Sequence, residues 1–226
     1  MRNMLLVDKP AGWTSFDAVN YVRKMAARSE GKKPRQIKVG HTGTLDPFAT
    51  GLLVILVGRE NTRRAGELSK LDKTYEATMR LGAVSSTGDP EGEITPVSDT
   101  RPDETALKEA LKRFTGQIEQ VPPAYSAVKV DGQRAYKLAR EGKEVTIEPR
   151  KVTVHHLDLI SYDYPEVRLT ADVSSGTYIR SLVQDIGEVL GTGAYTSALR
   201  RTRVGELSVA DASDVTDVGL DYIAKT

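Results

Sequence analysis

Residues 40–57 read GHTGTLDPFATGLLVILV, a glycine-rich segment that runs directly into an apolar one. The apolar part, residues 52–57, has the length of a strand, and a run without polar residues is typical of a strand buried on both faces of a sheet. Three glycines and Pro47 restrict the backbone before it. The pattern predicts a rigid loop that presents His41 and Asp46 at the edge or mouth of a sheet, although Asp-Pro alone is equally typical of an ordinary turn.

Strand and helix patterns follow one another irregularly along the rest of the chain. Alternating apolar residues predict half-buried strands at 75–81 and 167–173, and residues 4–7 predict another. Helical spacing predicts helices at 107–114, ended by Gly116, and at 179–190, ended by Gly191. A further helix, capped by Thr14 or Ser15, has the apolar face Phe16, Val19, Val22 and Met25. Because strands and helices do not alternate regularly, the predicted fold class is α+β, with a central mixed or antiparallel sheet flanked by helices.

Composition excludes several classes of protein. Of the 226 residues, 39% are hydrophobic and 28% are charged, as in globular proteins rather than disordered or fibrous ones. No stretch reaches the roughly 18 apolar residues of a membrane-spanning helix, so we expect a cytoplasmic protein with no membrane partner. The absence of cysteine and the three histidines without a ligand spacing predict no metal site. Catalysis would then use oxygen and nitrogen groups.

Positive charge gathers in residues 23–38, which we call the basic arm. It holds seven Lys or Arg residues against Glu30 alone, a local charge of +6. Such a run is either a solvated loop or a phosphate-binding surface. A second cluster, Arg200, Arg201 and Arg203, favours phosphate contact. For Lys9 and Lys129, the sequence is compatible with either a structural or a phosphate-binding role.

Several short blocks occur in an order that is known from one enzyme family. They are residues 6–15 (LVDKPAGWTS), 40–51, 73–89, 122–142, 176–182 and 199–201. Together they resemble the bacterial tRNA pseudouridine-55 synthases, of the TruB-type pseudouridine synthase family. The resemblance spans nearly the whole chain. It implies the pseudouridine synthase fold and an isomerase that converts uridine 55 in the T loop of tRNA to pseudouridine, through an aspartate nucleophile and after base flipping.

The resemblance implies three catalytic residues. Asp46 is the nucleophile, and a carboxylate can form a covalent adduct that divides a difficult step into easier ones. Burial would raise the pKa of such a carboxylate, so Arg180 is expected to pair with Asp46 and keep it charged. Tyr75 is expected to pack on the target uracil and to offer a phenol for proton transfer. Because the isomerisation involves no net redox change and no transferred group, no cofactor is expected.

Substrate binding is implied for His41, Tyr75, Tyr178 and Leu199. Tyr178 and Leu199 would line the uracil pocket with Tyr75. His41 would help to expose the base, because a planar side chain can stack where bases separate. The expected partner is the T arm of tRNA, and the protein is expected to act as a monomer.

Other interpretations stay open at this point. A guide-RNA-dependent relative that modifies ribosomal RNA in a protein complex would share the motif but is expected to have a long C-terminal extension. An RNA-folding factor would need the basic arm but not Asp46. An ordinary hydrolase is the third alternative, but the sequence does not contain the G-x-S-x-G element of that class. We expect residues 1–226 to be the catalytic domain, without the small PUA-like C-terminal RNA-binding domain of fuller members.

Overall fold

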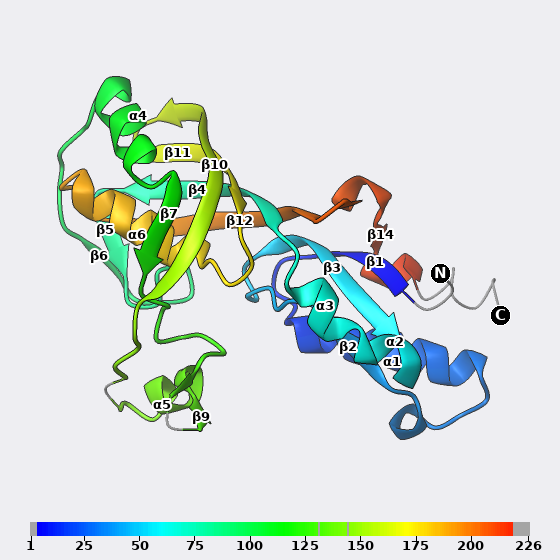
Figure 1. Ribbon diagram of the computed structural model, residues 1–226. Coiled ribbons are helices and arrows are strands. Elements are labelled where there is room, and N and C mark those ends of the chain that lie inside the picture. Colours follow the sequence, from blue (N-terminus) through cyan, green and yellow to red (C-terminus); the bar gives the residue numbers. More distant parts are fainter. Residues whose placement is uncertain (1–3, 131, 144, 219–226) are drawn as a thin grey trace. The chain divides into compact units, whose positions relative to one another are not determined.

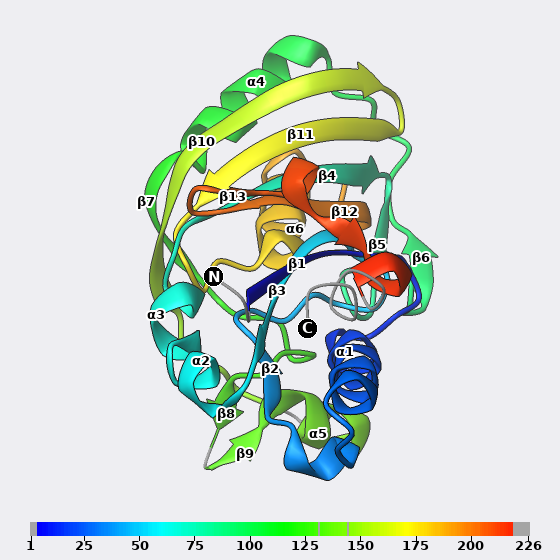
Figure 2. The same ribbon diagram turned by 90° about the vertical axis from the view of Figure 1, so that its right-hand side faces the viewer.

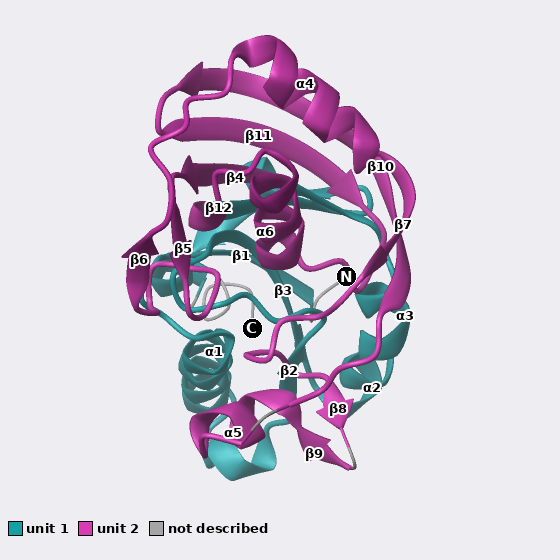
Figure 3. Cartoon of the chain, turned by 90° about the vertical axis from the view of Figure 1, so that its left-hand side faces the viewer, with its two compact units in different colours: residues 1–75, 199–226 teal, residues 76–198 magenta. Residues whose placement is uncertain are grey.

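The computed structural model describes residues 4–130, 132–143 and 145–218. The chain divides into two compact units (Figure 3). Unit 1 comprises Met1–Tyr75 and Leu199–Thr226, and unit 2 comprises Glu76–Ala198. Two strands, β4 (Lys73–Leu81) and β12 (Ala194–Val204), run from one unit into the other.

Unit 1 holds the short N-terminal strands and the longest helix of the described residues (Figures 1 and 2). Its elements are β1 (Met4–Lys9), α1 (Ser15–Ser29), η1 (Pro34–Gln36), β2 (Val39–His41), β3 (Thr50–Val57), α2 (Arg59–Arg63), α3 (Ala65–Ser69), β13 (Leu207–Ser208), η2 (Val209–Asp211) and β14 (Ser213–Asp214).

Unit 2 combines long antiparallel strands with two amphipathic helices. Its elements are β5 (Ala83–Ser85), β6 (Ile94–Pro96), α4 (Glu104–Arg113), β7 (Gly116–Gln120), β8 (Lys129–Val130), β9 (Gln133–Arg134), α5 (Ala135–Arg140), β10 (Arg150–Asp163), β11 (Glu166–Val173) and α6 (Ile179–Val189).

Within the described residues, the main sheet is mixed and has ten strands. Its order is β14-β1-β3-β12-β4-β11-β10-β7, with β2 paired to β3 and β13 paired to β12. The pairs β1–β14 and β3–β12 are parallel, whereas β1–β3, β2–β3, β7–β10 and β10–β11 are antiparallel. The predicted α+β class with a central mixed sheet is therefore confirmed.

Strand β3 is the centre of unit 1. Residues 52–57 are all at most 2% exposed, so the strand is buried on both faces as its unbroken apolar sequence predicts. Leu52, Val54 and Leu56 share one face and pack with Val204, Met4, Leu6, Ala65 and Leu68. Helix α1 also contacts β2 and β3. The loop before β3 is consequently attached to one of the most deeply buried parts of the unit.

Helix α1 begins as predicted, and two of the four residues predicted for its apolar face, Val19 and Val22, are buried. Thr14 is its N-cap, and a capping box joins Thr14 to Asp17. The buried residues are Ser15, Ala18, Val19, Val22, Ala26 and Ala27. Phe16 is 63% exposed, so its predicted place on the apolar face is wrong. Small Ala and Ser side chains make up the rest of the buried face beside Val19 and Val22.

The other local predictions hold with small differences. The alternating strands are β4 and β11, and the helices are α4 and α6. Helix α6 is followed by Gly191 at φ +68°, whereas α4 ends at Arg113 and Gly116, at φ +99°, begins β7. Across the described ranges, no helix combines the length and apolar character needed to cross a bilayer.

Candidate active site

The Asp46 loop, residues 42–49, connects the two strands of a hairpin in unit 1. Strands β2 and β3 pair antiparallel, with His41 opposite Ile55, and the backbone N–H of Thr42 donates to Val54 O at 3.1 Å. Beyond the last pair, the N–H of Ala49 donates to Asp46 O at 3.1 Å, which closes a turn over the aspartate. The loop predicted from its glycines and proline is thus a defined turn at the end of a buried hairpin.

Lys9 and Ser15 hold one side of this loop. The Lys9 ammonium is fully buried and donates to Pro10 O at 2.8 Å, Trp13 O at 2.7 Å and Pro47 O at 3.3 Å. The Ser15 hydroxyl donates to Leu45 O at 3.0 Å and accepts from Leu45 N at 2.8 Å. Buried carbonyl groups need hydrogen-bond donors, and two of the carbonyls held here belong to Leu45 and Pro47, the sequence neighbours of Asp46. Lys9 therefore has a structural role.

Arg201 holds the beginning of the loop and is only 2% exposed. Its Nε donates to Leu52 O at 2.8 Å, and its two terminal nitrogens donate to Thr44 O at 3.4 Å and Gly43 O at 3.0 Å. The predicted phosphate contact is therefore wrong for Arg201, because its guanidinium is buried and bound to backbone. Sequence could not distinguish this arginine from its two neighbours.

Arg200 and Arg203 differ from Arg201 in exposure. Arg200 forms a two-pronged ion pair with Asp8, at 2.6 and 3.0 Å. The Arg203 side chain is 48% exposed and lies 3.8 Å from Glu206 Oε2. An exposed pair of this kind contributes little to stability, so Arg203 is the member of the cluster best suited to phosphate contact.

Three further predicted residues lie in unit 1. Tyr75 on β4 and Leu199 on β12 are each 8% exposed, so both side chains are largely buried. His41 ends β2, and its Nδ1 is buried without a hydrogen-bond partner among the described residues. Burial, and secondly the charge of Arg201, lower the pKa of His41. The imidazole is therefore neutral at neutral pH, which suits stacking against a base.

Arg180 lies in unit 2, in the first turn of α6, and is 4% exposed. Its terminal nitrogens donate to Thr87 O and Tyr125 O, each at 2.8 Å, and one lies 3.3 Å from Asp89 Oδ2. Asp89 is buried, and its other oxygen accepts from Thr87 Oγ1 at 2.6 Å and from Glu91 N at 3.0 Å. This network fixes the plane of the guanidinium.

The buried Arg180–Asp89 pair was not predicted. Asp89 belongs to one of the recognised blocks, but nothing in its local sequence marks it as the partner of a residue 91 positions later. The predicted pairing of Arg180 with Asp46 concerns residues of different units, and it stays a prediction.

Tyr178 is the N-cap of α6, and a buried glutamine holds its backbone. The Tyr178 N–H donates to Gln120 Oε1 at 2.8 Å, and Gln120 Nε2 donates to Tyr178 O at 3.0 Å. The Tyr178 side chain packs with Val128, Ala135 and Ile147. Gln120 thereby orients the helix start that carries Arg180, and sequence reasoning missed it.

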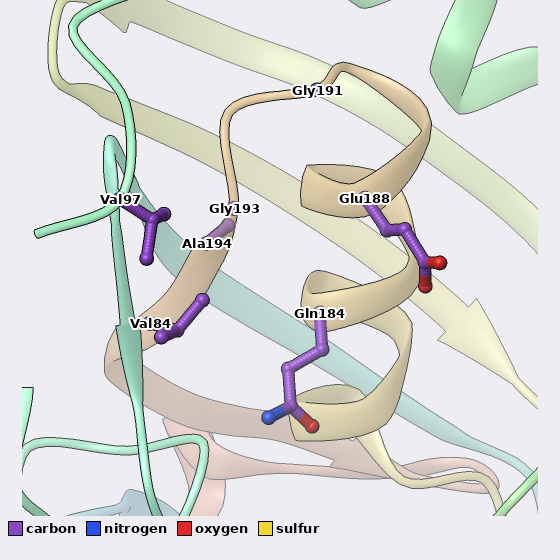
Figure 4. A pocket seen from close by; sticks show the side chains of 7 residues that line it. All are labelled: Val84, Val97, Gln184, Glu188, Gly191, Gly193 and Ala194. Carbon is purple, nitrogen blue, oxygen red and sulfur yellow. The ribbon is translucent and has the colours of Figure 1, made fainter. Parts of the chain in front are cut away.

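A separate open pocket of about 460 Å³ lies within unit 2 (Figure 4). It is lined by Val84, Val97, Gln184, Glu188, Gly191, Gly193 and Ala194. None of the predicted site residues lines it. Among the described residues, no group of three or more His, Asp or Glu side chains is arranged to hold a metal.

The chain matches two family models along most of its length. Residues 31–179 match the N-terminal domain of TruB family pseudouridylate synthase. The chain belongs to the TruB family. Residues 180–225 match the tRNA pseudouridylate synthase B C-terminal domain. The family prediction from the sequence blocks is therefore confirmed.

Curated TruB relatives and solved structures agree with this assignment. The chain is 47% identical over 209 residues to tRNA pseudouridine synthase B of Burkholderia mallei, covering 92% of the chain and 66% of the relative. The same identity holds over 214 residues to that of Cupriavidus metallidurans, covering 94% and 65%. The chain thus spans about two thirds of the length of these relatives.

Two solved structures support the fold. A Cbf5-Nop10-Gar1 complex gives a TM-score of 0.73 at 29% identity, over 99% of this chain and 55% of that one. An H/ACA RNP bound to a substrate RNA containing 2'-deoxyuridine gives 0.70 at 27% identity, over 99% and 54%. The pseudouridine synthase fold that the resemblance implied is confirmed.

Proposed function

We propose that this TruB-family chain isomerises uridine 55 in the T loop of tRNA to pseudouridine, with Asp46 as nucleophile. The observation that carries the proposal is the 47% identity, over 92% of the chain, to relatives named tRNA pseudouridine synthase B. The GTLDPFATG segment supports the choice of Asp46, because this aspartate lies in a turn in which the Leu45, Asp46 and Pro47 carbonyls accept hydrogen bonds.

The proposed reaction rearranges bonds within one nucleotide. The Asp46 carboxylate forms a covalent adduct, the bond between N1 of uracil and C1' of ribose breaks, and the base turns. A bond between C5 and C1' then forms, the bond between Asp46 and the nucleotide breaks, C5 loses its proton, and N1 gains one. No electrons or groups enter or leave, so the reaction needs no redox cofactor. The Tyr75 phenol, 8% exposed on β4, is the proposed group for proton transfer and for packing on the base.

Arg180 is proposed to keep Asp46 ionised, and Asp89 to hold Arg180. A guanidinium fixed by Thr87 O, Tyr125 O and Asp89 presents its charge in one orientation. His41, Tyr178 and Leu199 are proposed to receive the flipped base.

The competing interpretations are less well supported. The H/ACA-type structures share 27–29% identity with the chain, against 47% for the tRNA enzymes, which favours an enzyme that acts on tRNA without a guide. A folding factor without catalysis would not require the held Asp46 loop. We also propose that the chain acts as a cytoplasmic monomer and that residues 1–226 form its catalytic domain.

The direct test is to incubate unmodified tRNA with the purified protein and to map pseudouridine by a carbodiimide-dependent stop of reverse transcription. We expect a single new stop at position 55. A stop elsewhere would change the assigned site, and no stop under conditions in which the protein is folded would contradict the proposed activity.

The basic arm provides a second prediction. Six of its cations are exposed, namely Lys24, Arg28, Lys32, Lys33, Arg35 and Lys38. We propose that they contact phosphates of the T arm. Each contact should add about 0.7 to 0.9 to the slope of log affinity against log salt. Replacing Lys33, Arg35 and Lys38 by Gln should therefore lower the slope by about two to three while kcat stays within about twofold.

The matched control for this change is replacement of Lys108 and Lys112, exposed cations on α4 that already pair with Glu104 and Glu109. This control should leave the slope unchanged. A T-arm hairpin should show the same slope as whole tRNA and nearly the same kcat/KM. A steeper slope and a large preference for whole tRNA would show that contacts outside the T arm matter.

A further inference from the structure

We propose that Arg201 and Ser15 are positioning residues for the reaction, which hold the backbone of the Asp46 loop so that the carboxylate keeps its reactive orientation. The inference rests on the proposed function, because it assigns to these side chains a part in the step that Asp46 performs. Neither residue needs to touch RNA for this role, since both act through the loop.

Arg201 connects the two ends of the loop. Its Nη1 and Nη2 donate to Thr44 O and Gly43 O, before Asp46, and its Nε donates to Leu52 O, in the strand that follows. Three N–H groups in one plane thereby fix three carbonyls relative to one another. A lysine has the same charge but not this planar geometry, so it cannot reproduce the arrangement.

The Arg201 backbone is itself placed against the loop. Strand β12 pairs parallel with β3, with Arg201 opposite Gly51. A Cβ added at Gly51 would lie 2.3 Å from Arg201 O, and Gly51 has a φ of +102°. Only glycine fits both conditions. The backbone from which the guanidinium extends therefore has a fixed position beside the loop, and Arg201 as a whole is only 2% exposed.

Ser15 precedes the Asp46 loop in the sequence, whereas Arg201 follows it. Its hydroxyl, 2% exposed, both donates to and accepts from the backbone of Leu45, the residue immediately before Asp46. Together the two side chains fix residues 43, 44 and 45. Such fixation matters for rate because a displacement of about 1 Å at a reacting group can cost about 100-fold. Substrate affinity does not depend on it in the same way.

The expected signature is a loss of kcat without a loss of RNA binding. Arg201→Lys should lower kcat by about 10- to 100-fold, and Ser15→Ala by about 3- to 30-fold, with KM and the Kd for tRNA within about twofold of wild type. Arg80→Lys is the matched control, because Arg80 is also a strand arginine, on β4, but its side chain is 45% exposed and lies 3.5 Å from Glu166. It should keep the wild-type kcat.

A residue that is merely structural would behave differently. It would lower the midpoint of urea unfolding, but the folded protein would keep its kcat. Each variant is therefore assayed at a temperature where circular dichroism shows it folded, by single turnover with saturating enzyme. Ser15→Ala introduces a good helix former at the start of α1, so it tests the proposal even if Arg201→Lys does not fold.

Wild-type kcat in folded Ser15→Ala, or in folded Arg201→Lys, would overturn the inference. A rise in KM with unchanged kcat would overturn it too, because that result assigns the residues to binding. The result is separable from a failure of the proposed function. If the wild-type chain makes no pseudouridine, the proposed function fails; if it does and the variants match it, only this inference fails.

Discussion

Asp46→Asn should bind tRNA like the wild type and make no detectable pseudouridine, with a loss of at least about ten-thousand-fold in rate. The amide keeps the size of the carboxylate and can occupy the same turn, but it is not a nucleophile. We expect the loss in single-turnover measurements with tRNA tritiated at C5 of uracil, because the proposed reaction releases that hydrogen.

The variant must be purified free of the host's own enzyme. Asp99→Asn, a change at an exposed aspartate in unit 2, is the matched control and should have full activity. Appreciable tritium release by Asp46→Asn would mean that another group attacks the nucleotide, and the mechanism proposed here would then be wrong.

Arg180 should be the second most sensitive position. Arg180→Lys keeps the charge but loses the fork that donates to Thr87 O and Tyr125 O, so we expect kcat to fall by about 100-fold or more. Arg180→Met should in addition destabilise the fold by about 3–5 kcal/mol, because it leaves the buried Asp89 carboxylate without its ion-pair partner.

Urea unfolding separates these two effects. Combining Arg180→Met with Asp89→Asn should recover much of the lost stability, since no uncompensated charge remains, but none of the activity. Arg168→Lys is the control: its guanidinium lies 3.7 Å from Glu76 on the surface, and the change should alter stability by less than about 1 kcal/mol. Near wild-type turnover by Arg180→Lys would show that a point charge suffices.

Local sequence patterns predicted the elements well. The apolar run of β3, the alternation in β4 and β11 and the cap of α1 each depend on neighbours within a few residues. Phe16 was misplaced because helical spacing alone does not show which face of α1 will meet the sheet. Beside Val19 and Val22, the packing face consists of small Ser and Ala residues, and these give a weak hydrophobic signal.

The long-range contacts of the site were not predictable in the same way. Arg200, Arg201 and Arg203 are alike in sequence, yet only Arg201 is buried. Strand alternation does not identify it, because Arg203 shares the face of Arg201 and its side chain is 48% exposed. Asp89 and Gln120 are ordinary polar residues until the fold brings them to α6. The family resemblance named Asp46, Tyr75 and Arg180 but not the side chains that hold them.

The contact between β12 and the Asp46 loop joins two segments that are synthesised at different times during translation. Arg201 bonds Gly43 across 158 positions of sequence, and strand β12 is the partner that covers Gly51. During translation, residues 1–75 emerge from the ribosome long before residue 201. The loop that carries Asp46 can therefore reach its final conformation only after residue 201 has emerged. A chain interrupted before that point would contain the Asp46 loop sequence without the Arg201 contacts that hold its backbone.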